Sequence, residues 1–257
     1  MAARGYLLEG DLYMARFVNG VAGDLIGPFE GTVFSMQPQS NTVDMISRGR
    51  NSTGEIIESV SAKDPTQFNI TFAEANAEIL AMALMGNVAS LAQAAGNFSG
   101  APFNGTATVT AKTGAWVALP RANLTGSMDF EGGTPASQQL TEDVDYQLNR
   151  QLGLIRPIAG GLLTDGEVVT LVSGAFGAIA GSTIQGGTVP DVRAKFIMDG
   201  RNRVDGADIT VTVHEAIVAA NTAVDFLNGG FLTTALQGRM KKPSGKPSAF
   251  EVAVRTV

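Results

Sequence analysis

The hydrophobic period of the chain changes within residues 67–86, which read QFNITFAEANAEILAMALMG. In the first half, apolar positions alternate with polar, uncharged ones: Phe68, Ile70 and Phe72 against Gln67, Asn69 and Thr71. A period of two predicts a strand with one buried face and one face in water. The second half is rich in helix formers, so a short helix is expected to follow this half-polar strand directly.

The helix has recognisable end signals. Thr71 and Glu74 have the spacing of a capping box, in which the hydroxyl accepts from a first-turn amide and the carboxylate reaches back. Gly86 is suited to the left-handed conformation that ends many helices. The sequence therefore predicts a helix over residues 74–85.

Outside this unit, the chain reads as strands separated by Gly, Asn and Asp turns. Strands are expected at 12–18, 29–37, 42–47, 192–198, 207–214, 226–236 and 250–257. The charged and polar stretch 48–65 predicts a long exposed loop or an extended hairpin, and 88–95 a second helical turn or two.

Composition divides the chain into parts. Residues 97–105 are rich in Gly, Asn and Pro and resemble a linker, and only short strands are expected from there to 175. We therefore expect a mainly β fold with one flanking helix, in which 1–100 and 176–257 form the core and 101–175 form a small inserted all-β domain.

Charge and residue usage exclude several functional classes. The net charge is −6 and the pI is about 4.8, which argues against a general nucleic-acid binder. The chain has no cysteine, which excludes disulfides and thiolate chemistry and suits a reducing cytosol. The longest mostly apolar run, 168–181, is too short and glycine-rich to cross a bilayer, so no membrane insertion is expected.

Candidate catalytic residues are few. His214 is the only histidine and ends the alternation 208–214 on its polar side, which favours a surface or interface residue. Glu142, Asp143 and Asp145 form a small acidic cluster, for which a solvated strand edge is favoured over a metal or acid–base site.

Two further patterns are weak. Asp199, Asn202 and Asp205 lack the glutamate of a calcium loop, so a polar hairpin tip is favoured. The basic segment 239–246 is expected to be a soluble hairpin end, with a contact to an acidic neighbour as the alternative. We expect no catalytic residues, no metal and no cofactor, hence a protein that is not an enzyme.

The chain resembles the major tail tube protein of long-tailed bacteriophages. The resemblance lies in the order of several blocks rather than in one motif, and these blocks cover most of the chain: GTVFSMQPQSNTVDMISRGRNSTGEIIESV, PTQFNITFAEANAEILAMALMG, LTEDVDYQLNRQLGLIRPIAGGLLTDGEVVTLVSGAFGAIAG, GGTVPDVRAKFIMDGRNRVDGADITVTVHEA and VDFLNGGFLTTALQGRMKKPSGKPSAFEV.

The resemblance implies a structural virion protein with a tail-tube-type β-sandwich or barrel. Six copies would form a ring around a lumen, and stacked rings would conduct the genomic DNA into the host. The implied partners are other copies of the chain, a tape measure protein, tail terminator or tip proteins, and double-stranded DNA in non-specific passage. Assembly would take place in the bacterial cytoplasm.

The resemblance also places individual segments. The barrel strands would be 29–37, 42–47, 192–198 and 207–214. An inter-ring contact loop would carry Arg48, Arg50, Glu55, Glu58, Lys63 and Asp64. The helix would lie at the joint between neighbouring subunits through Glu74, Glu78, Ile79 and Met82. Polar residues facing the lumen would be Asp208, Thr210, Thr212 and His214.

An acidic chain suits DNA passage, because a basic wall would release counterions and retain the DNA. Arg193 and Lys195 lie on one face of a predicted barrel strand. We therefore expect carboxylates to neutralise them, or their side chains to point away from the lumen.

Two other functions remain open. A carbohydrate-binding or adhesin-like β module would use exposed aromatic residues, but Trp116 is the only tryptophan, and a tryptophan in a short strand is more often core. A hydrolase would have to use Glu142, Asp143 and Asp145.

Overall fold

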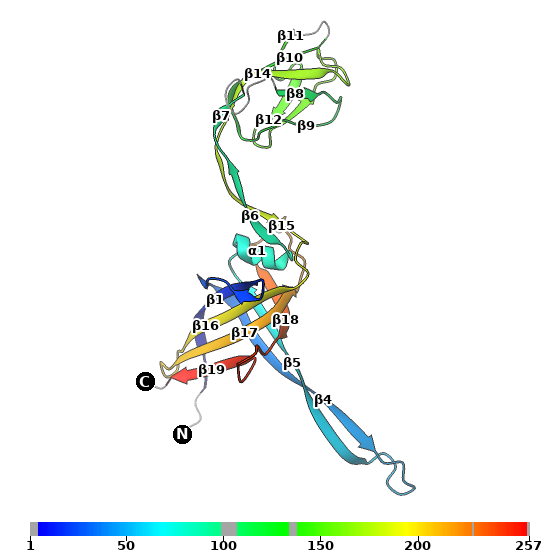
Figure 1. The fold of residues 1–257 in the computed structure, drawn as a ribbon, viewed down its shortest axis with the longest axis vertical. Helices are drawn as coiled ribbons and strands as arrows, with labels where there is room; N and C mark the ends of the chain where they lie inside the picture. Colours follow the sequence, from blue (N-terminus) through cyan, green and yellow to red (C-terminus); the bar gives the residue numbers. More distant parts are fainter. Residues whose placement is uncertain (1–4, 99–106, 134–137, 228, 256–257) are drawn as a thin grey trace. The chain divides into compact units, whose positions relative to one another are not determined.

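The computed structural model describes residues 5–98, 107–133, 138–227 and 229–255. The expectation of a mainly β chain with one helix is confirmed for these residues (Figure 1). Two compact units are present: 1–89 together with 183–257 form unit 1, and 90–182 form unit 2. The predicted limits of the inserted segment, 101 and 175, both lie inside unit 2.

Unit 1 is built on one large antiparallel sheet in the order β2-β1-β16-β17-β18-β5-β4. β17 is long enough to serve two neighbours, so β19 pairs with its first half and β18 with its second. The elements are β1 Leu8–Val18, β2 Val21–Ala22, β3 Ile26–Phe29, β4 Gly31–Ile46, β5 Ile56–Phe72, α1 Ala77–Ala83, β16 Val192–Asn202, β17 Asp208–Ala220, β18 Thr234–Met240 and β19 Phe250–Arg255.

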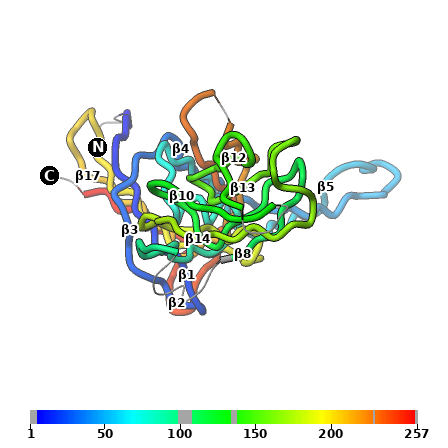
Figure 2. Tube along the Cα trace, turned by 90° about the horizontal axis from the view of Figure 1, so that it is seen from above, coloured from blue at the N-terminus to red at the C-terminus, as the bar shows by residue number. Residues whose placement is uncertain are grey.

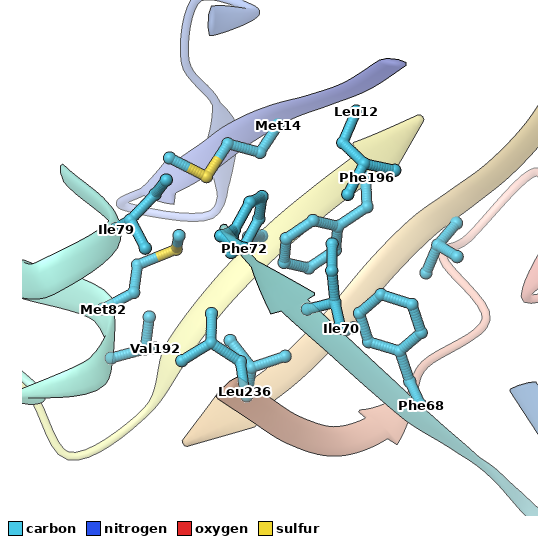
Figure 3. Close-up of a cluster of buried hydrophobic side chains, with 14 of the residues drawn as sticks. Leu12, Met14, Phe68, Ile70, Phe72, Ile79, Met82, Val192, Phe196 and Leu236 are labelled. Carbon is cyan, nitrogen blue, oxygen red and sulfur yellow. The ribbon is translucent and has the colours of Figure 1, made fainter. Parts of the chain in front are cut away.

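The apolar side chains of alternate strand positions meet in one core, as the period of two predicts. Phe68, Ile70 and Phe72 of β5 are fully buried there. Figure 3 shows them beside side chains from β1, β16 and β18. The Phe68 and Phe196 ring centroids lie 5.0 Å apart, which is normal for packed aromatic rings.

The helix is shorter than expected, and its predicted caps are wrong. β5 continues to Phe72, so Thr71 is a strand residue, and the N-cap is Asn76, whose side-chain oxygen accepts from the Ile79 amide at 2.8 Å. At the other end, Met85 takes the left-handed conformation (φ 50°). Gly86 is needed for a different reason, because the backbone of Gln185 passes close to it. A Cβ at this position would lie 2.4 Å from the Gln185 carbonyl oxygen.

The stretch 48–65 belongs to an extended hairpin, one of the two predicted alternatives. The predicted strands 29–37 and 42–47 fall largely in a single strand, β4, and 48–55 form the turn before β5. A register shift between Gln37 and Gln39 accommodates Pro38, which lacks an N–H and is tolerated because β4 is an edge strand. The ribbon projects beyond the other strands of unit 1 in both views (Figures 1 and 2).

Unit 2 has its own hydrophobic core, which includes Phe130, Tyr146 and Leu171. The predicted helical turn at 88–95 is wrong: β6 covers most of it and pairs with β15, and this ladder satisfies its backbone N–H and C=O groups. The remaining elements are β6 Asn87–Gln93, β7 Gly96–Asn97, β8 Ala107–Thr110, β9 Val117–Ala118, β10 Leu124–Gly132, β11 Gln138–Leu140, β12 Tyr146–Asn149, β13 Leu154–Pro157, β14 Val168–Phe176 and β15 Ile179–Gln185. Most of the predicted linker, 99–105, lies outside the described residues.

Candidate assembly surface

The far part of the β4–β5 ribbon has one apolar and one polar face. Val43 lies opposite Val60, and Met45 lies on the same face two positions on, opposite Glu58 at the edge of the apolar area. The Val43, Val60 and Met45 side chains are 60–67% exposed. The other face carries hydroxyls and a carboxylate: Thr42 bonds to Ser61 at 3.0 Å, and Ser59 donates to Asp44 at 2.6 Å. The ribbon therefore holds an apolar face in water with no cover from its own chain.

All six residues of the predicted contact loop lie on this ribbon. Arg48, Arg50 and Glu55 are in its turn, and Glu58, Lys63 and Asp64 are on β5. All six are exposed, and none makes a salt bridge to a described residue. Their charges are available to another molecule.

The outer face of the sheet beside the ribbon is polar and largely uncharged. Ser35, Asn69 and Gln237 lie directly opposite one another across β4, β5 and β18, and so form a row of neutral hydrogen-bonding groups. The next row consists of Gln37, Gln67 and Arg239. In the sequence, this face was indicated by the polar residues that alternate with Phe68, Ile70 and Phe72 within 67–72. The predicted strand 226–236 was wrong at both ends: β18 spans Thr234–Met240, so Gln237 and Arg239 lay beyond the predicted strand and were missed.

The predicted lumen residues do not all share one environment. Asp208 is exposed, and Thr210 and Thr212 are half-buried. His214 is 8% exposed, and its Nε2 lies 3.1 Å from the Glu251 carboxylate. The prediction that His214 is a surface or interface residue is therefore wrong, because the segment entering β19 packs beside this part of β17 and buries the ring within its own chain.

Arg193 and Lys195 have different partners. The Arg193 guanidinium lies 3.4 Å from the Glu215 carboxylate and 3.9 Å from Asp191, so its predicted neutralisation is confirmed. Lys241 binds the same Glu215 oxygen at 3.0 Å. Lys195 makes no salt bridge to any described residue. Glu215 was missed in the sequence because a register shift in β16–β17 places it beside the cations.

Of the four helix residues assigned to a subunit joint, two are buried and two lie at the surface. Ile79 and Met82 are completely buried in the core of their own chain, so they cannot contact a neighbour (Figure 3). A helix this short is not stable alone, and its apolar side is used to complete the core. Glu78 lies 3.9 Å from Arg16, and Glu74 is exposed in the turn before the helix.

A second apolar surface of unit 1 is a groove of about 530 Å³. Its walls come from β1, β4, β16, β17 and β19, and they include Leu8, Val33, Val252 and Val254. These four side chains are 42–52% exposed. No sequence pattern predicted this groove, because it depends on which strands come together.

In unit 2, the acidic cluster is structural. Asp145 is buried and accepts from the Thr141 and Leu162 amides, while Glu142 pairs with Arg150 at 2.6 Å. Burial, with a smaller contribution from Glu142, raises the pKa of Tyr146 to about 12. Within the described residues, no group of three or more His, Cys, Asp or Glu side chains is placed to hold a metal ion.

Trp116 is 42% exposed and not core, contrary to the usual expectation. The Arg156 guanidinium lies 4.9 Å from its ring centroid, and Arg156 in turn donates to Gln147.

A family model matches residues 5–251, nearly the whole chain, and its description is "Protein of unknown function UCP028589". No curated protein matches the chain. In the part of the chain that the structure describes, no helix has the length and hydrophobicity to span a membrane.

Proposed function

The chain belongs to this family of unknown function, and we propose that it is a structural protein that assembles into the tail tube of a long-tailed bacteriophage. In this proposal, six copies form a ring, and stacked rings enclose a lumen through which genomic DNA passes. The proposal includes no catalytic step.

The observation that carries the proposal is the apolar face of the β4–β5 ribbon. A two-stranded ribbon alone is marginally stable in water, and this one also exposes Val43, Met45 and Val60. Contact with another copy would bury these side chains and stabilise the ribbon. The six-membered ring and the stacking of rings are inferred from the resemblance to tail tube proteins.

The edge strand supports the same conclusion. β4 is the last strand of the sheet and runs for 16 residues, so its outer N–H and C=O groups have no strand beside them. Long open edges invite pairing with other chains, and closed rings of subunits remove such edges. The sheet of the single chain is open, and a continuous barrel would need strands from neighbouring copies.

The polar face of the sheet suits a wall along which DNA moves. The row Ser35, Asn69 and Gln237 offers no fixed charge to phosphates, and Arg193 is neutralised by Glu215. A wall with few free cations releases few counterions, so it holds DNA weakly. Lys195, Arg201 and Arg239 are cations on this face that make no salt bridge to a described residue.

Negative-stain microscopy and mass measurement of the purified protein test the proposal. We expect annular particles or tubes from the wild type. The double variant V43S/V60S, which removes one apolar cross-strand pair, should remain monomeric. The matched control T42A/S61A alters the directly opposed pair on the other face and should still assemble. A wild type that stays monomeric at every concentration would overturn the proposal.

A second candidate function, for unit 2, is carbohydrate binding. Trp116 presents part of its ring to solvent, and Arg156, held by Gln147, supplies donors beside it. Aromatic rings with neighbouring polar groups suit the mixed apolar and hydroxylated surface of sugars. A glycan array probed with wild type and Trp116→Ala tests this: binding lost in the variant supports it, and a blank array for the wild type contradicts it.

A further inference from the structure

A hollow of about 490 Å³ in unit 1 gathers basic side chains from separate parts of the sequence. Its walls come from the neighbouring strands β5, β18 and β17 and from the two residues that follow β18 (Figure 1). The charged residues that line it are Lys63, Asp64, Arg239, Lys241 and Lys242. Four cations and one carboxylate leave a positive surplus, although the whole chain carries a net charge of −6. We call this feature the basic hollow.

Three of the four cations have no carboxylate partner. Lys63, Arg239 and Lys242 are exposed, and none of them makes a salt bridge within the described part of the chain. Lys241 differs, because its Nζ lies 3.0 Å from the Glu215 carboxylate and its backbone amide donates to the Glu215 carbonyl oxygen at 2.8 Å. The basic hollow therefore presents three cations to an anion from another molecule.

The surface next to the basic hollow supplies neutral donors. A second hollow, of about 440 Å³, adjoins it and shares Ile217 and Arg239 with it. The other polar side chains that line this second hollow are the amides of Gln67, Asn69 and Gln237. The phosphate and sugar groups of DNA accept hydrogen bonds from Arg and Lys and also from Asn and Gln. Both kinds of donor are thus adjacent here, and Arg239 joins them.

We propose that the basic hollow binds phosphate groups of double-stranded DNA. The inference rests on the proposed tail-tube function, in which DNA moves along this polar face, and it names a point of contact. A carboxylate of a second copy is a single anion, whereas a DNA strand presents a phosphate at every nucleotide with sugar oxygens between them. A DNA strand therefore matches a surface on which unpaired cations are followed by neutral amides.

The contact is weak enough for passage. Lys63, Arg239 and Lys242 would each release about 0.9 counterion, so the logarithm of the binding constant should fall against the logarithm of the salt concentration with a slope of about −2.7. Lys241 is left out of this number because Glu215 pairs with it. A fourfold rise in salt should then weaken binding by about 40-fold. Such a contact positions DNA without retaining it.

Fluorescence anisotropy of a labelled DNA duplex, titrated with protein at several salt concentrations, tests the inference. The V43S/V60S chain is used so that single copies are measured. In this chain, R239A/K242A should change the slope from about −2.7 to about −0.9 and weaken binding equally for duplexes of different sequence. Arg239→Lys retains the charge and should retain the slope.

The matched control is R48A/R50A. Arg48 and Arg50 are also exposed and make no salt bridge to a described residue, but they lie in the turn of the ribbon and do not line the basic hollow. The control removes the same charge and should leave the slope unchanged. Urea unfolding should be the same for both double variants, because all four substituted side chains are exposed.

Competition distinguishes a DNA strand from free phosphate as the ligand. Inorganic phosphate should displace the duplex no better than chloride does at equal ionic strength, because the basic hollow binds several linked phosphates. Stronger displacement by inorganic phosphate would indicate a site for the free ion and would overturn the inference.

The other outcomes separate this inference from the proposed function. Equal slopes for R239A/K242A and R48A/R50A would overturn the inference, and if R239A/K242A also abolished assembly of an otherwise wild-type chain, the basic hollow would be a contact with a second copy. Annular particles without DNA binding at the basic hollow would leave the proposed function standing. DNA binding at the basic hollow by a wild type that never assembles would overturn the proposed function alone.

Discussion

Replacing Ile79 by alanine tests whether α1 supports its own chain or a neighbouring subunit. Ile79 is completely buried and points toward Phe72 in the core (Figure 3). The substitution removes three carbons, which is a loss of roughly 2.4 kcal/mol at about 0.8 kcal/mol per buried carbon. The cavity left behind brings the expected destabilisation to about 3–4 kcal/mol.

The assay is urea unfolding of the V43S/V60S variant, in which assembly should not contribute to stability. Circular dichroism follows the whole chain, and fluorescence of the single tryptophan, Trp116, follows unit 2 alone. Ile79→Ala should lower the stability of unit 1 and leave the tryptophan transition in place.

Glu78→Ala provides the matched control on the same helix. The Glu78 side chain is 41% exposed and lies 3.9 Å from Arg16, and such exposed pairs contribute about 0–1 kcal/mol. Suppose that Ile79→Ala lowers the free energy of unfolding by no more than Glu78→Ala does, but abolishes assembly in an otherwise wild-type chain. Then α1 is a subunit joint and does not support the core of its own chain.

Three further predictions concern single residues. Gly238→Ala should cost about 3 kcal/mol or more in urea unfolding, because a Cβ would lie 1.8 Å from the Ile217 carbonyl oxygen. Asn76→Ala should cost about 1 kcal/mol through loss of the helix cap, and Asn76→Ser should retain most of it. Because the pKa of Tyr146 is raised from 10.0 to about 12, folding stabilises its neutral form, and about 2–3 kcal/mol present below pH 10 should be lost as the pH rises toward 12. Tyr146→Phe should remove this alkaline loss from the Trp116 fluorescence transition.

Local alternation predicted most of the strands but not their ends. Phe68, Ile70 and Phe72 are core residues as their spacing indicates, because a buried sheet face enforces a period of two. The helix limits were wrong because Thr71 offered a capping box that the ladder with Ala235 overrides. Gly86 was assigned to a helix stop, but the reason for a glycine there is the nearby Gln185 backbone, which no local pattern reveals.

The candidate surfaces could be predicted only in part. The charged stretch 48–65 is exposed, as its composition indicates, but the apolar groove and the Glu215 cluster depend on contacts between strands far apart in the sequence. His214 shows the same limit: its polar face was inferred from alternation, and its burial comes from the segment entering β19.

The ribbon shows why alternation alone cannot distinguish a core strand from an assembly strand. Val43 and Val60 have the same period of two as Phe68 and Ile70, but the register shift between Gln37 and Gln39 places one extra residue in β5. Along β4, Val43 therefore alternates in phase with Ser35 and Gln37 and not with the core residues' partners Phe34 and Met36. The difference is that β18 pairs with β5 only between Gln67 and Phe72, and no third strand accompanies the rest of the ribbon. The apolar face of the ribbon lies past the end of its own sheet, so water is its only intrachain neighbour. Selection for folding of the single chain would favour polar residues at those positions, so their presence argues that a second molecule covers them.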